Sequence, residues 1–469
     1  MTELMIPFDD KSAPLYEQIY RFIKEEIVSG RIPAQTKLPS TRRLAVNLSV
    51  SRTTVQLAYD QLTAEGYLES EPCRGYFSAD VGVLLQMYRT GADSEAAKPD
   101  FQEEEEKPIV DFSPRGIDLE HFPYNTWRKL SREILTDDHK NLFTSGDPRG
   151  ELSLRQAICR YLKSARLVDC RPEQMIIGAG SEYLLMLLNQ ILGGSAIAME
   201  NPTYKQAYRV FRRLGHPVVP VPMDKNGMQT EALRATGAEI AYIMPSHQYP
   251  TGVVMPIKRR QELLAWAAES KGRYIIEDDY DSEFRYRGKP IPALWGSGDP
   301  GKVIYLGTFS KSVAPAIRVS YMILPDALLE RYNRNCSFYA STVSRVDQEI
   351  LTRFLSEGYF ERHLNRMRGI YRTKHDVLLT ALEPSREHFS IQGDMAGLHI
   401  LLKSKGGRSE GRLIRQAEEA GIRVYGLSSY FIKEMEQPEE MSQTVILGYA
   451  NLTEEEIRRG VEVLVRVWS

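Results

Sequence analysis

The chain has 469 residues, of which 42% are apolar and 26% charged, and its formal net charge is -2. This length predicts two or three domains, and the composition argues against wholesale disorder and excludes a uniformly basic coat for nucleic acid. The four cysteines form no CxxC pair and no zinc spacing, which indicates free thiols in a reducing cytoplasm. No signal peptide, membrane span or metal site is expected.

Residues 12–80 are predicted to form a compact unit of three helices followed by a two-stranded hairpin. The first helix has apolar residues at helical spacing and stops at Gly30. The second follows Ser40, a predicted N-cap, and the third ends at Gly66. The hairpin turns at residues 72–75. This order of elements is typical of a winged helix-turn-helix, an α+β fold whose third helix enters the major groove of DNA.

Basic residues are concentrated in this unit, because residues 28–59 contain no Asp or Glu. Phosphate contact requires such a local excess of positive charge even when the net charge of the chain is near zero. The basic residues in this range are Arg31, Lys37, Arg42, Arg43 and Arg52. A small helical domain with a solvated basic face is the alternative interpretation.

The third helix separates its side chains into two groups. Val55, Ala58 and Leu62 fall on one face, which is predicted to pack inward. The helix start and the other face carry side chains suited to DNA, because Arg reads guanine, Gln reads adenine, and Ser and Thr hold phosphate. These residues are Ser51, Arg52, Thr53 and Gln56.

One stretch of this unit resembles the GntR family of winged-helix regulators, and it reads LPSTRRLAVNLSVSRTTVQLAYDQLTAEGYL. The resemblance covers about residues 12–80 and implies double-stranded promoter DNA as a partner. It also adds the basic second helix and the wing to the predicted DNA contacts. The contacts it implies are Arg42, Ser51, Arg52, Gln56, Arg74 and Gly75, with Arg43 beside them in the basic second helix.

Beyond this unit the character of the sequence changes twice. Residues 81–108 are charged and polar, with an acidic run, and are predicted to form a linker. From 109 to 469, helical patterns alternate with short apolar runs, which predicts an α/β fold with a largely parallel sheet. The clearest strands are QMIIGAG, AIAME, EIAYIMP, GRYIIED and KVIYLGT. The C-terminal part is expected to form a smaller α+β subdomain.

Lys311 and Asp278 lie where open α/β sheets bind ligands, because each follows or ends a predicted strand. Pyridoxal phosphate (PLP) needs a lysine for a Schiff base and a carboxylate facing its ring nitrogen. Side chains alternate along a strand, so only one of Asp278 and Asp279 should face the ring, and Asp278 is favoured. Tyr280 is predicted to reach the ring hydroxyl, and Tyr204 to stack on the ring.

A second set of residues is suited to a phosphate group. The stretch GAGSEYLLMLL predicts a turn and a helix start at which Gly180, Ser181 and Glu182 offer backbone N–H groups. The Glu182 carboxylate would repel phosphate if it pointed inward. Ser310 and Arg318 are also predicted to bind the phosphate. Taken singly, a lysine in a loop is usually a surface charge, an Asp after an apolar run is usually a cap or turn residue, and a Tyr after Pro is usually a core or turn residue.

The ordered set of motifs resembles the class I, fold-type I aminotransferases over about residues 110–469, and it comprises GDPRGELSLRQAICRYL, NPTY, PTG, IIEDDY and GTFSKSVAPAIR. The resemblance implies PLP as the cofactor and a homodimer with sites near the subunit interface. The residues it places at the cofactor are Lys311 (aldimine), Asp278 (ring nitrogen), Tyr204 (stacking), and Ser181, Ser310 and Arg318 (phosphate).

The chain departs from the aminotransferase pattern at several positions. Tyr249 stands before PTG where Asn is usual, and Asp281 stands where a Tyr is usual. Ile446 and Leu447 stand where an Arg usually holds the substrate carboxylate, and Arg423 is a candidate substitute that also fits a solvent-facing charge. These departures preserve cofactor binding and leave turnover and substrate class open.

The two halves together resemble the MocR/GabR subfamily of bacterial regulators over nearly the whole chain. The resemblance implies a cytoplasmic transcription factor that senses an amine, an amino acid or PLP itself through an aldimine at Lys311, with little or no turnover. GABA-sensing members carry an Arg two residues after the stacking Tyr, and this chain has Gln206, so GABA is not expected. An active aminotransferase that also binds DNA and a scaffold without cofactor are the alternatives.

Overall fold

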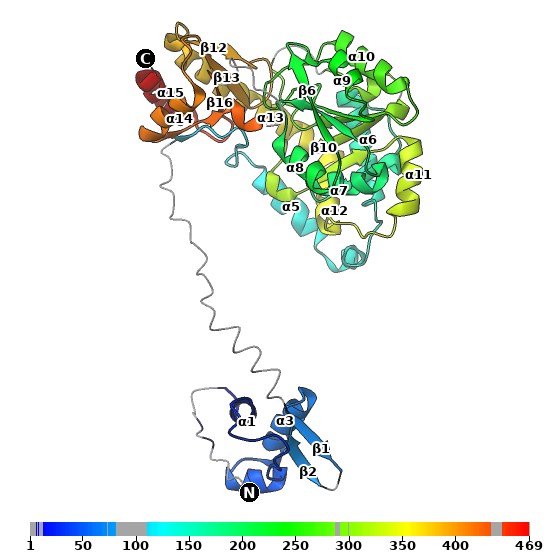
Figure 1. Ribbon diagram of the computed structural model, residues 1–469, viewed down its shortest axis with the longest axis vertical. Helices are drawn as coiled ribbons and strands as arrows, with labels where there is room; N and C mark the ends of the chain where they lie inside the picture. Colours follow the sequence, from blue (N-terminus) through cyan, green and yellow to red (C-terminus); the bar gives the residue numbers. More distant parts are fainter. Residues whose placement is uncertain are drawn as a thin grey trace. The chain divides into compact units, whose positions relative to one another are not determined.

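The computed structural model describes residues 6, 8, 13–72, 74–80, 110–286, 291–298, 300–432 and 443–468. The chain divides into two compact units, Met1–Lys107 and Pro108–Ser469, and each is described by itself (Figure 1). The predicted linker at 81–108 and one of the four cysteines, Cys73, lie outside the described residues. The other three cysteines are free thiols.

The N-terminal unit has the predicted order of three helices and a hairpin (Figure 1). The two strands pair antiparallel, as the wing of a winged helix-turn-helix does. The elements are α1 (Leu15–Val28), α2 (Thr41–Asn47), α3 (Arg52–Ala64), β1 (Leu68–Glu71) and β2 (Gly75–Ser78).

Serine caps and one apolar face position helix α3 in this unit. The Ser40 hydroxyl accepts from the backbone N–H of Arg43 at 3.3 Å and so begins α2, as predicted. Val55, Ala58 and Leu62 are fully buried against the other helices. The opposite face of α3 is thereby left toward solvent.

Eight strands form the main sheet of the second unit, in the order β4-β11-β10-β9-β8-β5-β6-β7. Neighbours from β10 to β6 pair parallel, whereas β11 and β7 run antiparallel to their neighbours. The prediction of a largely parallel sheet is confirmed. The strands are β4 (Met175–Gly178), β5 (Ile197–Asn201), β6 (Val218–Asp224), β7 (Gly227–Met228), β8 (Ile240–Ile243), β9 (Tyr274–Asp279), β10 (Val303–Thr308) and β11 (Ser320–Ile323).

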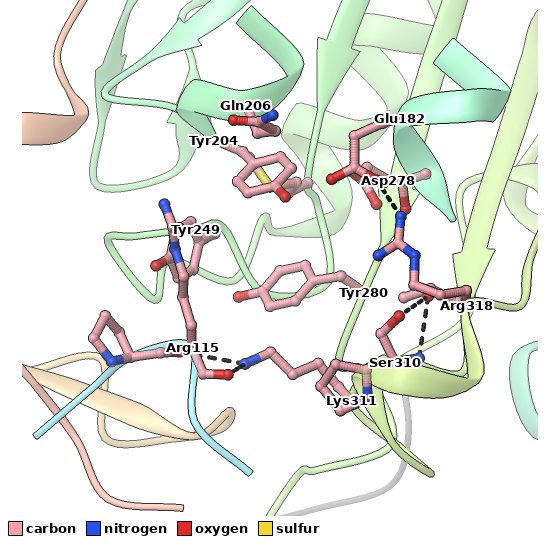
Figure 2. A pocket seen from close by; sticks show the side chains of 15 residues that line it. Arg115, Glu182, Tyr204, Gln206, Tyr249, Asp278, Tyr280, Ser310, Lys311 and Arg318 are labelled. Atoms are coloured by element: carbon pink, nitrogen blue, oxygen red, sulfur yellow. Dashed lines mark hydrogen bonds and ion pairs between the residues drawn. The ribbon is translucent and has the colours of Figure 1, made fainter. Parts of the chain in front are cut away.

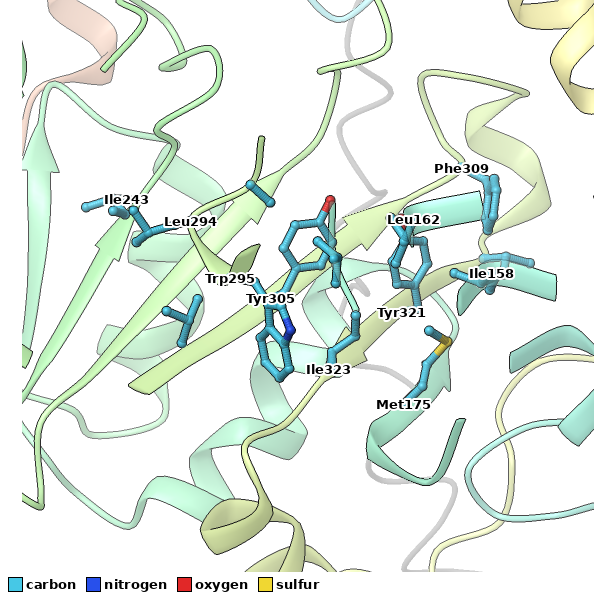
Figure 3. Close-up of a cluster of buried hydrophobic side chains, with 14 of the residues drawn as sticks. Ile158, Leu162, Met175, Ile243, Leu294, Trp295, Tyr305, Phe309, Tyr321 and Ile323 are labelled. Carbon is cyan, nitrogen blue, oxygen red and sulfur yellow. The ribbon is translucent and has the colours of Figure 1, made fainter. Parts of the chain in front are cut away.

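Helices cover both faces of this sheet, because alternate side chains along each strand enter different cores. Val303 and Tyr305 of β10 pack with α5, α6, α9, α10, α12 and α13, and part of this core is drawn in Figure 3. Ile304 and Leu306 pack with α7, α8 and α11. The result is a three-layer α/β/α arrangement.

The helices of this unit vary widely in length. The α-helices are α5 (Tyr124–Ile134), α6 (Leu152–Arg166), α7 (Ser181–Leu192), α8 (Lys205–Arg213), α9 (Thr230–Ala235), α10 (Ile257–Ala268), α11 (Asp326–Asn335), α12 (Arg345–Ser356), α13 (Tyr359–Ala381), α14 (Glu410–Glu419) and α15 (Glu454–Trp468). The 3₁₀ helices are η1 (Asp137–Phe143), η2 (Pro172–Gln174), η3 (Trp295–Ser297), η4 (Pro300–Lys302), η5 (Pro315–Ile317), η6 (Glu383–Ser385) and η7 (Leu427–Tyr430).

A smaller α+β subdomain completes the unit, as predicted, and is orange to red in Figure 1. Its four-stranded sheet has the order β12-β13-β16-β15, and β14 pairs parallel with β3. Helix α13 joins the subdomain to the larger part, because its two halves contribute to different cores. The strands are β3 (Val110–Asp111), β12 (Phe389–Gln392), β13 (His399–Ser404), β14 (Ile422–Arg423), β15 (Tyr425–Gly426) and β16 (Thr444–Gly448).

Two further properties concern only the part of the chain that the structure describes. Within it, no helix has both the length and the apolar character that crossing a bilayer requires. The same residues contain no group of three or more His, Cys, Asp or Glu side chains arranged to hold a metal ion.

Candidate functional site

A cavity of about 440 Å³ lies at the carboxyl ends of the central strands (Figure 2). It contains all but one of the predicted cofactor residues, and the exception, Gly180, is adjacent to it. Gln206 lines it as well, whereas Arg423, in β14, does not. The lining residues are Pro114, Arg115, Ser181, Glu182, Tyr204, Gln206, Met244, Tyr249, Asp278, Tyr280, Thr308, Ser310, Lys311, Pro315 and Arg318.

Lys311 follows β10 and turns its amine into this cavity (Figure 2). Its Nζ donates to the backbone carbonyl of Arg115 at 2.9 Å and to that of Pro114 at 3.4 Å. Desolvation by the cavity walls lowers the pKa of Lys311 to about 8, and the Arg115 charge acts in the same direction while Asp281 opposes it. At pH 7 roughly a tenth of the amine is therefore neutral, far more than for a solvated lysine, and the neutral form is the one that attacks a carbonyl.

The two neighbouring carboxylates of β9 point to opposite faces of the sheet, as strand alternation predicts. Asp278 lines the cavity and accepts a hydrogen bond from the Tyr242 hydroxyl. Asp279 instead forms an ion pair with Arg166 at 2.8 Å and accepts from Tyr305. Burial raises the pKa of Asp278 to about 7, although its hydrogen bond from Tyr242 opposes the rise. A cationic ring nitrogen beside Asp278 would supply the missing positive partner.

Arg318 and the start of α7 form another wall of the cavity. Helix α7 begins at Ser181, with Gly180 as its N-cap. A Cβ at Gly180 would come within 2.1 Å of an Arg318 nitrogen, so only glycine allows this approach. The Glu182 carboxylate forms an ion pair with Arg318 at 2.9 Å, so its negative charge is balanced beside the predicted phosphate site. Ser310 donates its backbone N–H to the Thr308 hydroxyl at 3.1 Å.

Three tyrosines line the cavity, and a fourth, Tyr430, contacts one of them. The ring centroid of Tyr249 lies 6.0 Å from that of Tyr204 and 5.7 Å from that of Tyr280. The hydroxyls of Tyr249 and Tyr430 share a hydrogen bond of 2.9 Å. Tyr249, which stands where aminotransferases usually have Asn, is thus part of an aromatic wall.

A buried histidine and aspartate hold Tyr280 from behind. His247 Nδ1 lies 2.9 Å from the Tyr280 hydroxyl and 2.9 Å from a carboxylate oxygen of Asp281. Both His247 and Asp281 are 2% exposed. Sequence reasoning noted Asp281 only as a departure, because nothing in the linear sequence connects it to His247. The signal available in the sequence was a histidine three positions before PTG.

Pro114 and Arg115 were missed by the sequence analysis. They follow β3, and Arg115 lies 196 positions before Lys311 in the chain. Pairing of β3 with β14 brings this segment to the cavity. A Pro-Arg-Gly turn directly after a short strand was the only signal in the sequence.

The predicted DNA contacts lie on α2, α3 and the hairpin. Arg42, Arg43, Arg52 and Thr53 are exposed. The hydroxyl of Ser51 is the N-cap of α3, where it accepts from the backbone N–H of Thr54 at 3.0 Å. A basic, solvent-facing helix start of this kind suits contact with phosphates and base edges.

The remaining predicted DNA contacts have partners within the unit. The Gln56 amide donates to Asp60 at 2.7 Å and to the Tyr76 hydroxyl at 3.1 Å. Arg74 is exposed beside Gly75 at the start of β2, and its guanidinium pairs with Glu71. These partners orient the two side chains in the absence of DNA.

Comparisons with known proteins agree with both units. The family of bacterial regulatory proteins named gntR matches residues 15–77, and the aminotransferase class I and II family matches residues 117–464. The chain is thus a transcriptional regulator with a DNA-binding helix-turn-helix unit and an aminotransferase-like unit. It belongs to the MocR/GabR subfamily of GntR-type regulators.

Two relatives resemble the chain over nearly its full length. The HTH-type transcriptional regulator YhdI of Bacillus subtilis (strain 168) is 42% identical, over 99% of this chain and 98% of the relative. The probable rhizopine catabolism regulatory protein MocR of Rhizobium meliloti is 33% identical, over 97% of this chain and 94% of the relative. Both units therefore recur together in these proteins.

Among solved structures, LysN, an α-aminoadipate aminotransferase of Thermus thermophilus, has a TM-score of 0.66 and 26% identity. The match covers 77% of this chain and 92% of that chain, which was complexed with N-(5'-phosphopyridoxyl)-L-leucine. The aminotransferase family and fold imply PLP as the cofactor of this unit. The cavity fits PLP, because it offers a partly neutral lysine amine, a buried carboxyl group and an arginine beside a helix start.

Proposed function

We propose that the chain is a DNA-binding regulator that carries PLP at Lys311 and changes its DNA affinity when a small amine or amino acid enters the cavity. The observation that carries this proposal is the set of Lys311, Asp278 and Arg318 around one cavity, on the same chain as a winged helix-turn-helix. A cytoplasmic homodimer is the form in which we expect it to act.

We assign the cavity residues to parts of the cofactor. When bound, PLP supplies a carbonyl carbon that condenses with primary amines and a ring that withdraws electrons. Lys311 contributes the amine, and Asp278 holds a proton at the ring nitrogen. Tyr204 lies against the ring, and Tyr280 donates to its hydroxyl oxygen. The phosphate is assigned to Ser310, Arg318 and the α7 start with Gly180, Ser181 and Glu182.

We assign sequence recognition to the start of α3. Arg52, Thr53 and Gln56 would meet base edges, while Arg42 and Arg43 of α2 would contact phosphates. Arg74 and Gly75 of the wing would contact the adjacent backbone. Ser51, as the N-cap, fixes the residue at which α3 begins and so positions these side chains.

An active aminotransferase that also binds DNA is the second candidate. The complete set of Lys311, Asp278 and Tyr280 favours it, because this set suits proton transfer as well as capture. Ile446 and Leu447 disfavour it, since both are fully buried and neither can hold a substrate carboxylate in the usual place.

The two candidates predict different solution behaviour. Full-length protein loaded with PLP should show the visible absorption of the lysine-bound cofactor. Its affinity for DNA from upstream of its own gene, measured by fluorescence anisotropy, should change when an effector amine alters that absorption. Unchanged affinity across a broad panel of amines and amino acids would contradict sensing.

A turnover assay separates regulator from enzyme. With an amino donor and a keto acid in excess, we expect at most one slow half-reaction for each cavity. Sustained multiple turnovers, measured by product formation, would favour the aminotransferase. Colourless protein after incubation with PLP would contradict both candidates.

A further inference from the structure

Arg115 places a positive charge in the cavity that no acidic side chain of the described residues neutralises. Its side chain rises from the segment after β3 along the aromatic wall (Figure 2). Among the described residues, no carboxylate forms an ion pair with it. Arg318, in contrast, is paired with Glu182. Arg115 is exposed and its guanidinium is hydrogen-bonded with Tyr249, so an anionic ligand that enters the cavity can pair with it.

The groups around Arg115 are hydroxyls that keep their protons. Burial raises the pKa of Tyr249 and of Tyr430 above the ordinary value, and it raises that of Tyr204 to about 12. Burial lowers the pKa of Arg115, but these three tyrosines outweigh it and raise the value. At neutral pH the Arg115 charge is therefore flanked by neutral hydroxyls, which can donate to the same anion.

The same residue also contacts the lysine amine. The Arg115 carbonyl accepts from Lys311 Nζ at 2.9 Å, while its side chain extends to the tyrosines. Arg115 therefore extends from Lys311, where an amine would react, to the tyrosines, where an anion would fit. A cavity of about 440 Å³ accommodates a small ligand that carries both groups.

Resting on the proposed function, we propose that Arg115 binds the carboxylate of the effector, which makes the effector an amino acid and not a simple amine. The planar guanidinium binds a carboxylate through two parallel hydrogen bonds. The tyrosine hydroxyls and the Gln206 amide supply further donors on the same wall. Arg115 thereby takes over the task of the arginine that is missing at Ile446 and Leu447.

Paired ligands test this assignment directly. PLP-loaded full-length protein is titrated with L-amino acids, β-alanine and γ-aminobutyrate, and with the matching amines that lack the carboxylate, while visible absorption is followed. The best amino acid should bind more tightly than its matching amine by a factor of roughly 10 to 100, as a charge-assisted pair allows. Equal affinities in the wild type would overturn the inference and leave the proposed function standing.

Variants assign the preference to a residue. Arg115→Gln should remove the preference for the carboxylate while the affinity for the matching amine changes less than about threefold, and Arg115→Lys should restore part of it. Arg128→Gln, an exposed change on α5, is the matched control. If Arg423→Gln removes the preference instead, or Arg115→Gln weakens both ligands equally, Arg115 is not the carboxylate site.

Two further outcomes separate this inference from the proposed function. Loss of the cofactor's visible absorption in Arg115→Gln would mean that Arg115 holds PLP, which overturns the inference alone. A wild type that responds to no amine and no amino acid overturns both.

Acetate provides a test without mutation, because it should compete with the amino acid but not with the matching amine. Equal competition with both ligands, or with neither, would contradict the assignment.

Discussion

The two units of this chain keep their functional charges in opposite environments. In the DNA-binding unit, Arg42, Arg52 and Arg74 are exposed on the surface of a small core. In the cavity unit, Asp278 and Lys311 are desolvated, and the pKa of each is shifted toward neutrality. A solvated charge is inexpensive to maintain and is screened by salt, whereas a buried charge depends on its partners. In the first unit a functional charge can therefore be removed with little effect on stability. In the second unit the functional charges depend on the structure around them.

A buried ion pair next to the site illustrates how strongly a buried charge depends on its partner. Arg166 and Asp279 pair at 2.8 Å with side chains that are 4% and 2% exposed. Removing one partner of such a pair typically destabilises a protein by about 3–5 kcal/mol. The cavity carboxylate Asp278 has no such cation among the described residues, so a cationic ligand would stabilise its charged form.

The largest effect is expected from Lys311→Ala, which removes the reactive amine. The visible absorption of lysine-bound PLP should disappear, and DNA affinity should lose its response to effector while basal DNA binding persists. Absorption spectra and anisotropy titrations check this, with the exposed Lys258→Ala as control. A variant that keeps both the band and the response would show that another residue holds the cofactor.

Leu62→Ala tests whether the two units are independent in stability. Leu62 is fully buried in the DNA-binding unit, so its truncation should destabilise that unit by about 2–5 kcal/mol. Thermal unfolding should show an earlier loss of DNA binding, while the visible absorption at Lys311 is retained. Gln61→Ala, at the neighbouring exposed position, should change little. Simultaneous loss of both signals would contradict separate units.

Arg52→Ala tests the exposed charges of α3. Loss of a base-reading arginine should weaken specific binding by about 1–3 kcal/mol, roughly fivefold to 150-fold, and should relax sequence preference. Because Arg52 is exposed, the unfolding temperature should not change. Arg21→Ala, on the exposed side of α1, is the control. Unchanged binding of Arg52→Ala would remove α3 from the proposed DNA interface.

The smallest effect concerns the rate at which apoprotein takes up PLP. Only the neutral amine attacks a carbonyl, and a pKa of about 8 means that Lys311 is protonated below that value. The initial rate should rise about fivefold from pH 7 to pH 8 and level off above it, as a single titration predicts. Stopped-flow absorbance measures this rate. A rise that continues beyond pH 9 would indicate an ordinary, solvated lysine.

Sequence alone predicted the architecture where local pattern decides it. Short apolar runs predicted β8, β9 and β10, because buried parallel strands are apolar on both faces. Strand ends then placed Lys311 and Asp278 at one edge, and the cavity contains both. Residues that reach the site through tertiary packing were missed, since Arg115 depends on the pairing of β3 with β14. The contact of His247 with Asp281 was missed for the same reason.

The carbonyls of Pro114 and Arg115 give the cavity a connection to the start of its own unit. Both lie just after β3, the first strand after the segment that leads from the DNA-binding unit. The Lys311 amine donates to both carbonyls, so a bond between this amine and a cofactor would change the hydrogen bonding of both. Two hydrogen bonds to main-chain carbonyls thus link the lysine of the cavity to the first described segment of its own unit.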